Sequence, residues 1–535
     1  MTFRCPPRTF RITLLFDAFL GLCAEANYLL RYLLAGASSH IAIKMERVRE
    51  DLPPSANGWW RDLAAVTIFA IIKVYLLIRF GIRDWHDNDG AGYITLAESF
   101  RGWQTWVSVP DLQSTVTPLS LLRMPGYSLL ILAMQVTVGD FWIVALISLQ
   151  LVASGFATFV LYRTIWSFSS SWFVGILGAA WFASSSIGWF ELCILSDSFA
   201  TSIFTILLCG IGLLVFRGRL LTPLAVAAIA TAFPLLFLLR EANILLALAL
   251  VPLVWAALPR THRLGRLTGV YAPLALVFIM MALWQQYRTG YFLVTTGGQG
   301  NPVEALALID KISPILDQEN PVDRAVRSVT AGMAPSDVAQ NSWSIAVKIN
   351  ELLAEQLDIR APQIARLALN RYLSVWLEHP FEMLAHVARN QTIIRTAGVS
   401  PVIYNDRHLS ARTREFHSFA SQRVVEWGLI NLPLLWFAVL IVAAPLRRPA
   451  LMAFGLWVTS MVPVLFYSAM FLETRYVLSS LGPILLVLAL TIGTGIRVLS
   501  RNIPMRERHD LTRLRQSVEP LAGFEADQAA NRPAG

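Results

Sequence analysis

The sequence predicts an all-α polytopic integral membrane protein with roughly ten transmembrane helices, in a range of about nine to thirteen. Of its 535 residues, 55% are hydrophobic and only 15% are charged, and the mean hydropathy is +0.55. A soluble domain of this size carries about a quarter charged residues, so the composition excludes an ordinary soluble fold. Long apolar runs alternate with short loops that carry arginine, which is the pattern of successive membrane-spanning helices.

The net charge of +9 does not indicate nucleic-acid binding, because the arginines cluster in short loops between apolar runs. The cysteines all fall outside the largest polar segment, and their positions predict neither a disulfide framework nor a metal cluster. An Asp/His cluster at residues 84–89 lacks regular ligand spacing, so no metal site is predicted there. A bound divalent cation is left open, and no other cofactor is expected.

The first 58 residues precede the clear spans. Their two apolar runs, 12–24 and 28–43, are interrupted by Asp17 and Arg31, and neither reaches the roughly 20 residues that a span needs. Two interpretations stay open. Either the segment forms an interfacial or signal-like helix, or the working protein begins at Met45.

The first clear span, 63–82, follows a group of basic residues, which places its start in the cytoplasm and the next loop, 83–140, outside. Within that loop, segment 125–139 is too short to cross and predicts a half-helix that enters the outer leaflet. If segment 125–139 does not cross the membrane, the arginine clusters of the later short loops all lie on the cytoplasmic side. The later expected spans are 141–163, 172–189, 197–216, 220–239, 242–258, 267–286, 428–445, 450–471 and 476–497.

These spans divide the chain into a transmembrane module at 59–286, a polar region at 287–425 and C-terminal transmembrane helices at 426–498. The polar region contains amphipathic stretches at helical spacing, separated by prolines, and predicts a small, mainly helical extracytoplasmic domain. The basic tail, 499–535, is expected to be cytoplasmic and disordered.

Ionisable residues recur at the expected outer ends of the spans, so the topology gathers them on one face. Charges at a membrane edge are costly and are functional candidates by default. Arginine binds phosphate in a bidentate manner, and a carboxylate accepts a proton from an attacking hydroxyl, so the set predicts chemistry on a phosphate-bearing lipid. The candidates are Asp84, His86, Asp87, Asp89, Arg123, Glu191, Asp197, Arg240, Glu241, Glu473 and Arg475.

Structural interpretations compete with these roles. Glu473 and Arg475 are as readily explained by a structural ion pair. Asp197 lies in a Ser-Asp-Ser sequence that suits a helix N-cap. Lys73 within the first span is expected to snorkel or to pack between helices.

The first outer loop contains two short motifs. One is Asp89-Gly-Ala-Gly-Tyr93-Ile-Thr-Leu-Ala97, in which Tyr follows Asp after four residues and Ala follows Tyr after four more. It resembles the first outer-loop motif of the GT-C superfamily of membrane glycosyltransferases. Arg123-Met-Pro-Gly-Tyr127 resembles the Arg/Lys-x-Pro-Gly/Pro-Tyr segment. Each motif is weak alone, and their order and sidedness add specificity.

Later turns extend the resemblance over roughly residues 60–500. Leu195-Ser-Asp197 resembles the acidic residue that opens a later span, and Leu239-Arg240-Glu241 and Glu473-Thr-Arg475 resemble recurrent outer turns. The similarity is greatest to the bacterial branch related to protein O-mannosyltransferases and aminoarabinose transferases.

The resemblance implies transfer of a sugar, with inversion, from a polyprenyl-phosphate carrier to an acceptor outside the cytoplasm. Asp89 matches the catalytic carboxylate proposed as base, Arg123 matches a basic residue that contacts the carrier phosphate, and Tyr93 lines the same pocket. Many relatives have Asp-Glu or a single Asp where this chain has Asp87-Asn-Asp89, so Asp87 is an alternative base. Further donor-binding candidates are Arg240, Glu241, Asp197 and Arg475.

The resemblance also implies a bacterial inner membrane, with the site facing the periplasm. The acceptor is a lipid, an envelope glycan or a protein, membrane lipids surround the chain, and nucleic acid is not a partner. Two alternatives stay open. A transporter or flippase for a lipid-linked sugar would want charges near the bilayer midplane and internal repeats, which the sequence does not display. A non-catalytic scaffold of the same fold would not need the Asp89/Arg123 pair.

Overall fold

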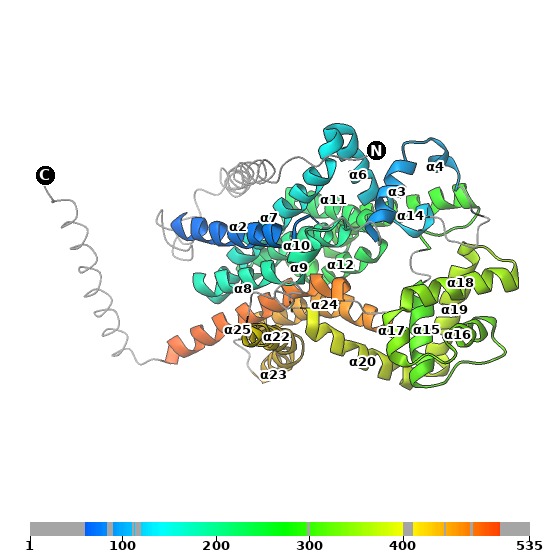
Figure 1. Ribbon diagram of the computed structural model, residues 1–535. Helices are drawn as coiled ribbons and strands as arrows, with labels where there is room; N and C mark the ends of the chain where they lie inside the picture. Colours follow the sequence, from blue (N-terminus) through cyan, green and yellow to red (C-terminus); the bar gives the residue numbers. More distant parts are fainter. Residues whose placement is uncertain are drawn as a thin grey trace, which may run out of the picture.

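The computed structural model describes residues 59–82, 89–109, 112, 119–296, 300–397, 399, 410–442, 446–470 and 474–502. The N-terminal segment 1–58 and residues 503–535 of the tail lie outside these ranges, and so do Asp84, His86, Asp87 and Glu473. All regular elements of the described residues are helices, which confirms the prediction of an all-α polytopic fold. Figure 1 shows a bundle of long helices with a cluster of shorter helices, α15 to α19, beside one end of it.

The long helices of the bundle are α2 (Trp59–Phe80), α6 (Pro125–Val138), α7 (Trp142–Ser169), α8 (Trp172–Ser184), α10 (Ser196–Arg217), α11 (Pro223–Leu239), α14 (Arg263–Thr289), α22 (Ala411–Glu426), α23 (Leu432–Val442), α24 (Arg447–Ala469) and α25 (Leu481–Asn502). Short helical pieces join them: α3 (Asp89–Ser99), α4 (Gln104–Val107), α5 (Leu119–Leu122), η3 (Gly139–Phe141), α9 (Ser186–Phe190), η4 (Glu241–Asn243), α12 (Ile244–Ala249), α13 (Val251–Ala257), η6 (Trp427–Asn431) and η8 (Thr474–Ser480).

Seven helices of the described residues are long and apolar enough to cross a membrane, so the chain is a multi-pass membrane protein. They are Trp59–Phe80, Pro125–Ser169, Ser196–Arg217, Arg263–Thr289, Ala411–Ile441, Arg447–Ala469 and Val477–Val498. The expected spans 172–189, 220–239 and 242–258 form helices too short for this group. The predicted number of roughly ten therefore stays a prediction.

Local chemistry accounts for the shorter helices. Ser185 ends α8, and its hydroxyl accepts a hydrogen bond from the Ile187 amide, which starts α9 in a new direction. Pro252 lies in the first turn of α13 and separates it from α12, because proline donates no backbone hydrogen bond. The 14-residue helix α6, at the position of the predicted half-helix, ends at Gly139 with φ of 60°. At about 21 Å, a helix of this length is shorter than the hydrocarbon core.

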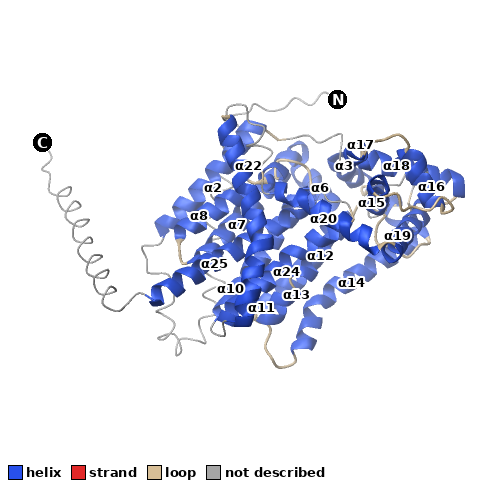
Figure 2. Cartoon of the chain, turned by 90° about the horizontal axis from the view of Figure 1, so that it is seen from below, coloured by secondary structure: helices blue, strands red, loops and turns tan. Residues whose placement is uncertain are grey.

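Helix α7 is the centre of the bundle and packs on α2, α6, α8, α10 and α25 (Figure 2). Small residues on its inward faces, such as Ser154, Gly155 and Ala157, allow neighbouring backbones to approach closely. Outward-facing side chains of the bundle, such as Ile71 and Ile78 of α2, are large and apolar, as lipid contact requires.

The two ends of α10 differ in charge. Asp197 lies in its first turn and Arg217 in its last, about 30 Å apart for a helix of this length. Arg448 donates to the Val215 carbonyl at 3.2 Å, and Arg163 pairs with Asp62 at 3.0 Å. Arg217 and Arg448, which the sequence assigned to the cytoplasmic side, thus lie at the end of the bundle opposite Asp197.

The second cluster of helices has its own hydrophobic core. It comprises α15 (Gly300–Ile312), α16 (Pro321–Thr330), α17 (Pro335–Gln340), α18 (Ser342–Leu357) and α19 (Ala361–Glu378). Residues such as Leu306, Val326, Ile349 and Val375 are fully buried in this core, which is separate from that of the bundle. Prolines lie in the first turns of α16, α17 and α19, where a missing amide costs little. Helix α20 (Pro380–Ala397) then leads back to the bundle.

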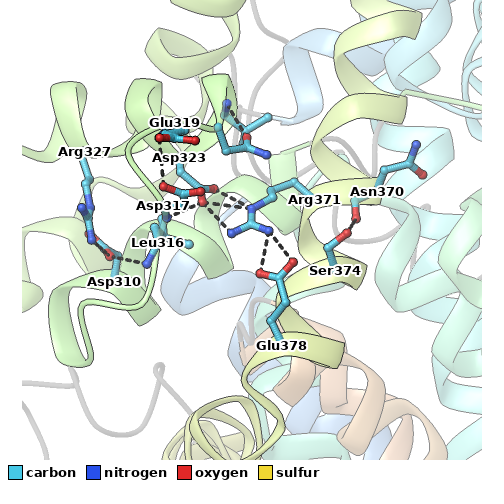
Figure 3. A network of polar contacts seen from close by, with 12 residues as sticks. Asp310, Leu316, Asp317, Glu319, Asp323, Arg327, Asn370, Arg371, Ser374 and Glu378 are labelled. Carbon is cyan, nitrogen blue, oxygen red and sulfur yellow. Dashed lines mark hydrogen bonds and ion pairs between the residues drawn. The ribbon is translucent and has the colours of Figure 1, made fainter.

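An ion-pair network crosses this second core (Figure 3). Arg371 of α19 donates to both oxygens of the fully buried Asp323 of α16, at 3.0 and 2.7 Å, and to Glu378 at 2.8 Å. The Asp317 amide also donates to Asp323, at 2.8 Å. The hydrogen bonds to Asp323 raise the pKa of the Arg371 guanidinium above its ordinary value. The network ties α16 to α19 and to the loop before α16.

We expect Asp323→Ala to lower the free energy of unfolding of this helix cluster by about 3 kcal/mol, because it leaves the buried guanidinium of Arg371 without its main counter-charge. Thermal unfolding of the purified protein and proteolysis within residues 300–378 measure the loss. The control is Glu319→Ala, whose exposed side chain lies outside the core. Equal protease resistance in both variants would contradict the assigned role of Asp323.

Candidate functional site

Tyr93 of the first loop is buried at one end of the helix bundle. Asp89 is the first residue of α3, and only its backbone is described. Tyr93 follows four residues later, is 2% exposed, and belongs to the same core as α6 and α10. Residues four apart in a helix share a face, so Asp89 lies on the face of α3 that carries Tyr93. The two acidic residues before α3, Asp84 and Asp87, lie outside the described residues.

The second motif meets the first through aromatic contacts. The rings of Tyr93 and Tyr127 are 5.0 Å apart in an edge-to-face arrangement. The guanidinium carbon of Arg123 lies 5.4 Å from the centre of the Tyr93 ring, within the range of a cation–π interaction. Arg123 comes just before the start of α6, at Pro125. The two loop motifs therefore form one structural unit.

A glycine explains how α6 reaches the next motif. A Cβ atom on Gly126 would lie 2.5 Å from the carbonyl oxygen of Leu238, near the end of α11. No side chain fits at that distance, so a residue without Cβ is required for the start of α6 to pack on the end of α11. Arg240, which follows α11 in extended conformation, is thereby brought to the same region as Arg123.

Arg240 and Asp197 form an ion pair at the start of α10. Nη1 of Arg240 lies 2.5 Å from Oδ1 of Asp197, and the two side chains are 13% and 9% exposed. The N-cap interpretation of Asp197 is wrong, because the cap position is Leu195 and Asp197 lies one residue inside the helix. In the first turn its negative charge is favoured by the helix dipole, and Arg240 neutralises it further.

The hydroxyl of Tyr93 links these elements. It lies 3.1 Å from Oγ of Ser196, the first residue of α10. Burial raises the pKa of Tyr93, and the nearby positive charges of Arg123 and Arg240 oppose this only in part. The phenol therefore stays protonated at neutral pH and can donate a hydrogen bond. Tyr93 thus contacts Arg123 through its ring and Ser196 of α10 through its hydroxyl.

A polar pocket opens beside this ion pair. Its polar lining comes from α10, η4, α24 and η8: Asp197, Thr201, Arg240, Asn243, Tyr467 and Ser479. Glu241 follows Arg240 directly but does not line the pocket. Arg475 belongs to η8, which also carries Ser479, and its side chain is not described. Ser196, Asn243, Tyr467 and Ser479 were not predicted as site residues, since single Ser, Asn and Tyr residues at helix ends carry no pattern of their own.

Glu191, a predicted member of the site, points elsewhere. It is fully buried, and its carboxylate binds Nζ of Lys73 at 2.5 Å and accepts a hydrogen bond from Ser154. Lys73 is only 5% exposed, so it packs between helices and does not snorkel. Nearby, Gln150 donates to the carbonyls of Glu191 and Cys193, at 3.0 and 2.9 Å.

Gln150 also accepts a hydrogen bond from the hydroxyl of Tyr127, at 2.5 Å. This connects the Lys73–Glu191 pair with the aromatic contacts at Tyr93. A glutamine in an otherwise apolar span was a sequence signal for such a role, because an unsatisfied amide inside a membrane is costly. Among the described residues there is no group of three His, Cys, Asp or Glu residues that could hold a metal ion.

No protein-family model and no curated protein matches the chain. Two solved structures of ArnT from Cupriavidus metallidurans are similar to it, each over 78% of both chains. The form bound to undecaprenyl phosphate has 15% identity and a TM-score of 0.29, and the apo form has 16% and 0.28. At these scores the likeness bears on neither the activity nor the substrate of this chain.

We expect Gly126→Ala to separate α6 from α11, because the added Cβ meets the Leu238 carbonyl at 2.5 Å. Overpacking of this kind costs about 1–3 kcal/mol, and a lower thermal midpoint of the purified protein measures it. Gly102→Ala is the matched control in the same loop, where the nearest atom to the new Cβ is Ser99 O at 3.6 Å. An unchanged midpoint for Gly126→Ala would mean that the two helices are not held together at this point.

Proposed function

We propose that this protein is a glycosyltransferase that moves a sugar from a polyprenyl-phosphate-linked donor to an acceptor at the extracytoplasmic membrane face. One observation carries the proposal. Tyr93, Arg123, Asp197 and Arg240 come from four motifs far apart in sequence, and they meet at one end of a bundle of apolar helices. Such a site combines groups that bind phosphate with a surrounding surface that a lipid chain can contact.

The two arginines suit the donor phosphate. Arg123 lies on the ring of Tyr93, and Arg240 lies in the polar pocket with Asp197. A guanidinium presents paired donors to phosphate oxygens and keeps its charge under all relevant conditions. Two of them near a leaving phosphate stabilise the charge that develops on it, most strongly where water is scarce. Tyr93, Glu241, Asp197 and Arg475 complete the proposed donor site.

The base is an acidic residue of the first loop. Asp89 begins α3 on the face that carries Tyr93, and Asp87 two residues earlier is the alternative. In the proposed step the carboxylate takes the proton of an acceptor hydroxyl, whose oxygen forms a bond to the anomeric carbon. The bond from that carbon to the phosphate oxygen breaks, and the polyprenyl phosphate leaves with the electron pair. Attack opposite the leaving group inverts the configuration.

The proposal has consequences for location and organisation. The chain would lie in a bacterial inner membrane with the site facing the periplasm and the arginine-rich end in the cytoplasm. Residues 59–286 would form the catalytic transmembrane module, with 426–498 completing the bundle. Residues 287–425 would form an extracytoplasmic helical domain, and the acceptor would be a lipid, an envelope glycan or a protein.

We expect Asp89→Asn to reduce sugar transfer by about 10²- to 10⁴-fold, because the amide cannot take the acceptor proton. Membranes that contain wild type, Asp89→Asn or Asp87→Asn are compared for transfer of radiolabelled sugar from a panel of polyprenyl-phosphate donors. Asp140→Asn is the control, because Asp140 is an exposed residue of the turn after α6. If only Asp87→Asn fails, the reaction stands and the base is Asp87. Absence of transfer by wild type from every donor would overturn the proposal.

We expect Arg123→Gln to weaken binding of undecaprenyl phosphate by about 10- to 100-fold, since a charge-assisted hydrogen bond contributes about 1.5–3 kcal/mol. Titration of the purified protein with the lipid, followed by native mass spectrometry, gives the dissociation constants. Arg101→Gln serves as the control, because Arg101 is exposed in the same loop and binds Gln135 at 3.0 Å. Equal affinity of both variants would exclude Arg123 from the phosphate site.

A further inference from the structure

Helix α19 presents a row of exposed leucines. Leu369, Leu373 and Leu377 are spaced by four residues and therefore lie on one face of the helix. Their side chains are 41%, 50% and 86% exposed. Scattered apolar side chains on a surface need no explanation, but a continuous row of this kind does.

The opposite face of α19 is already covered by protein. Ala368, Tyr372 and Val375 are buried in the core of the helix cluster, and Arg371 binds Asp323 there. Helix α19 therefore has two apolar faces, and the second core uses only one of them. The leucine row is not needed to hold α19 in that core.

Helix α20 repeats the arrangement. Phe381 and Leu384 are 81% and 56% exposed, and the next residue, Ala385, is exposed as well. On the other side of the helix, Met383 and His386 are buried. Leu377 and Phe381 lie on either side of the junction between the two helices, at His379.

The buried face of α20 packs on the end of a candidate membrane span. Asn390 donates to the Ser468 carbonyl at 2.9 Å, and His386 lies 3.3 Å from the Met470 carbonyl. From α19, the hydroxyl of Tyr372 donates to the Ala469 carbonyl. Ala469 ends α24, which is long and apolar enough to cross a membrane. Figure 1 shows α20 running from α19 toward α24, so both helices lie where a membrane-spanning helix emerges.

We propose that the exposed row of α19 and α20 contacts the lipid leaflet at this end of the bundle. The row, named here the apolar row, comprises Leu369, Leu373, Leu377, Phe381 and Leu384. Amphipathic helices that lie in the membrane interface place such a face among the acyl chains. The contacts of Tyr372, His386 and Asn390 with the end of α24 hold both helices beside the end of a candidate membrane span. The inference goes beyond the proposed function and does not depend on it.

Spin labels on single cysteines test the proposal. Leu377→Cys and Phe381→Cys are labelled in full-length protein whose four native cysteines are replaced by serine, and the protein is placed in phosphatidylethanolamine/phosphatidylglycerol nanodiscs. Collision rates with oxygen, which dissolves in lipid, and with a water-soluble nickel chelate report the depth of each label. Glu355→Cys on α18 is the control, because its side chain is exposed and lies outside the row.

We expect both labels on the row to collide with oxygen more often than with the nickel chelate, because oxygen dissolves in the acyl chains and the chelate stays in water. The Glu355→Cys label is expected to show the reverse preference. If the labels at 377 and 381 behave like the control, the row faces water and the proposal is wrong. If they are shielded from both reagents, a protein surface covers the row, from a second copy or another partner, and the lipid assignment is also wrong.

Discussion

The buried ion pair between Lys73 and Glu191 is the interaction on which the rest of the bundle depends. A lysine in a membrane-spanning helix and a carboxylate with no exposure must satisfy each other inside the protein, and their Nζ–Oε2 distance is 2.5 Å. Ser154 of α7 binds the same carboxylate. The pair therefore joins α2, α7 and the turn before α10. Removing one partner of a buried ion pair lowers the free energy of unfolding by about 3–5 kcal/mol, because the other charge is left unpaired. Arrangements of these three elements that separate Lys73 from Glu191 are therefore strongly disfavoured.

The consequences of this pair reach the candidate site through a continuous set of contacts. Gln150 holds the backbone of the same turn through Glu191 and Cys193, and it accepts from Tyr127. Tyr127 packs against Tyr93, whose hydroxyl meets Ser196 at the start of α10. The positions of Tyr93 and Ser196 thus depend in part on buried polar groups that are not themselves members of the proposed site. Full hydrogen-bond satisfaction gives such a network its rigidity in a low-dielectric interior.

Much of this arrangement could be predicted from the sequence, and the limits have physical causes. Apolar runs and prolines indicate where helices begin and end, and the sidedness of the arginines predicts that Arg123, Asp197 and Arg240 lie at one end of the bundle. Sidedness alone does not distinguish a site residue from a structural one, however. Glu191 and Asp197 are both predicted at the outer membrane edge. Glu191 nevertheless lies in the core, because it pairs there with Lys73 of a neighbouring helix. Such ion pairs depend on which helices are neighbours in the bundle. The hydrophobic periodicity of the sequence does not show which helices those are.

The break between two of the expected spans, 220–239 and 242–258, lies at the polar pocket. Helix α11 ends before Arg240, and η4 separates it from α12. Arg240, η4 and η8 line the pocket together with α10 and α24. Backbone outside helices is tolerated within a membrane protein only where protein buries it or where it lines a cavity. Side chains bind the non-helical backbone here. Gln150 donates to two carbonyls of the turn between α9 and α10, and Asn243 donates to the Leu236 carbonyl at 2.9 Å. Helix α11 is short because the chain leaves helical geometry at Arg240, where it lines the pocket.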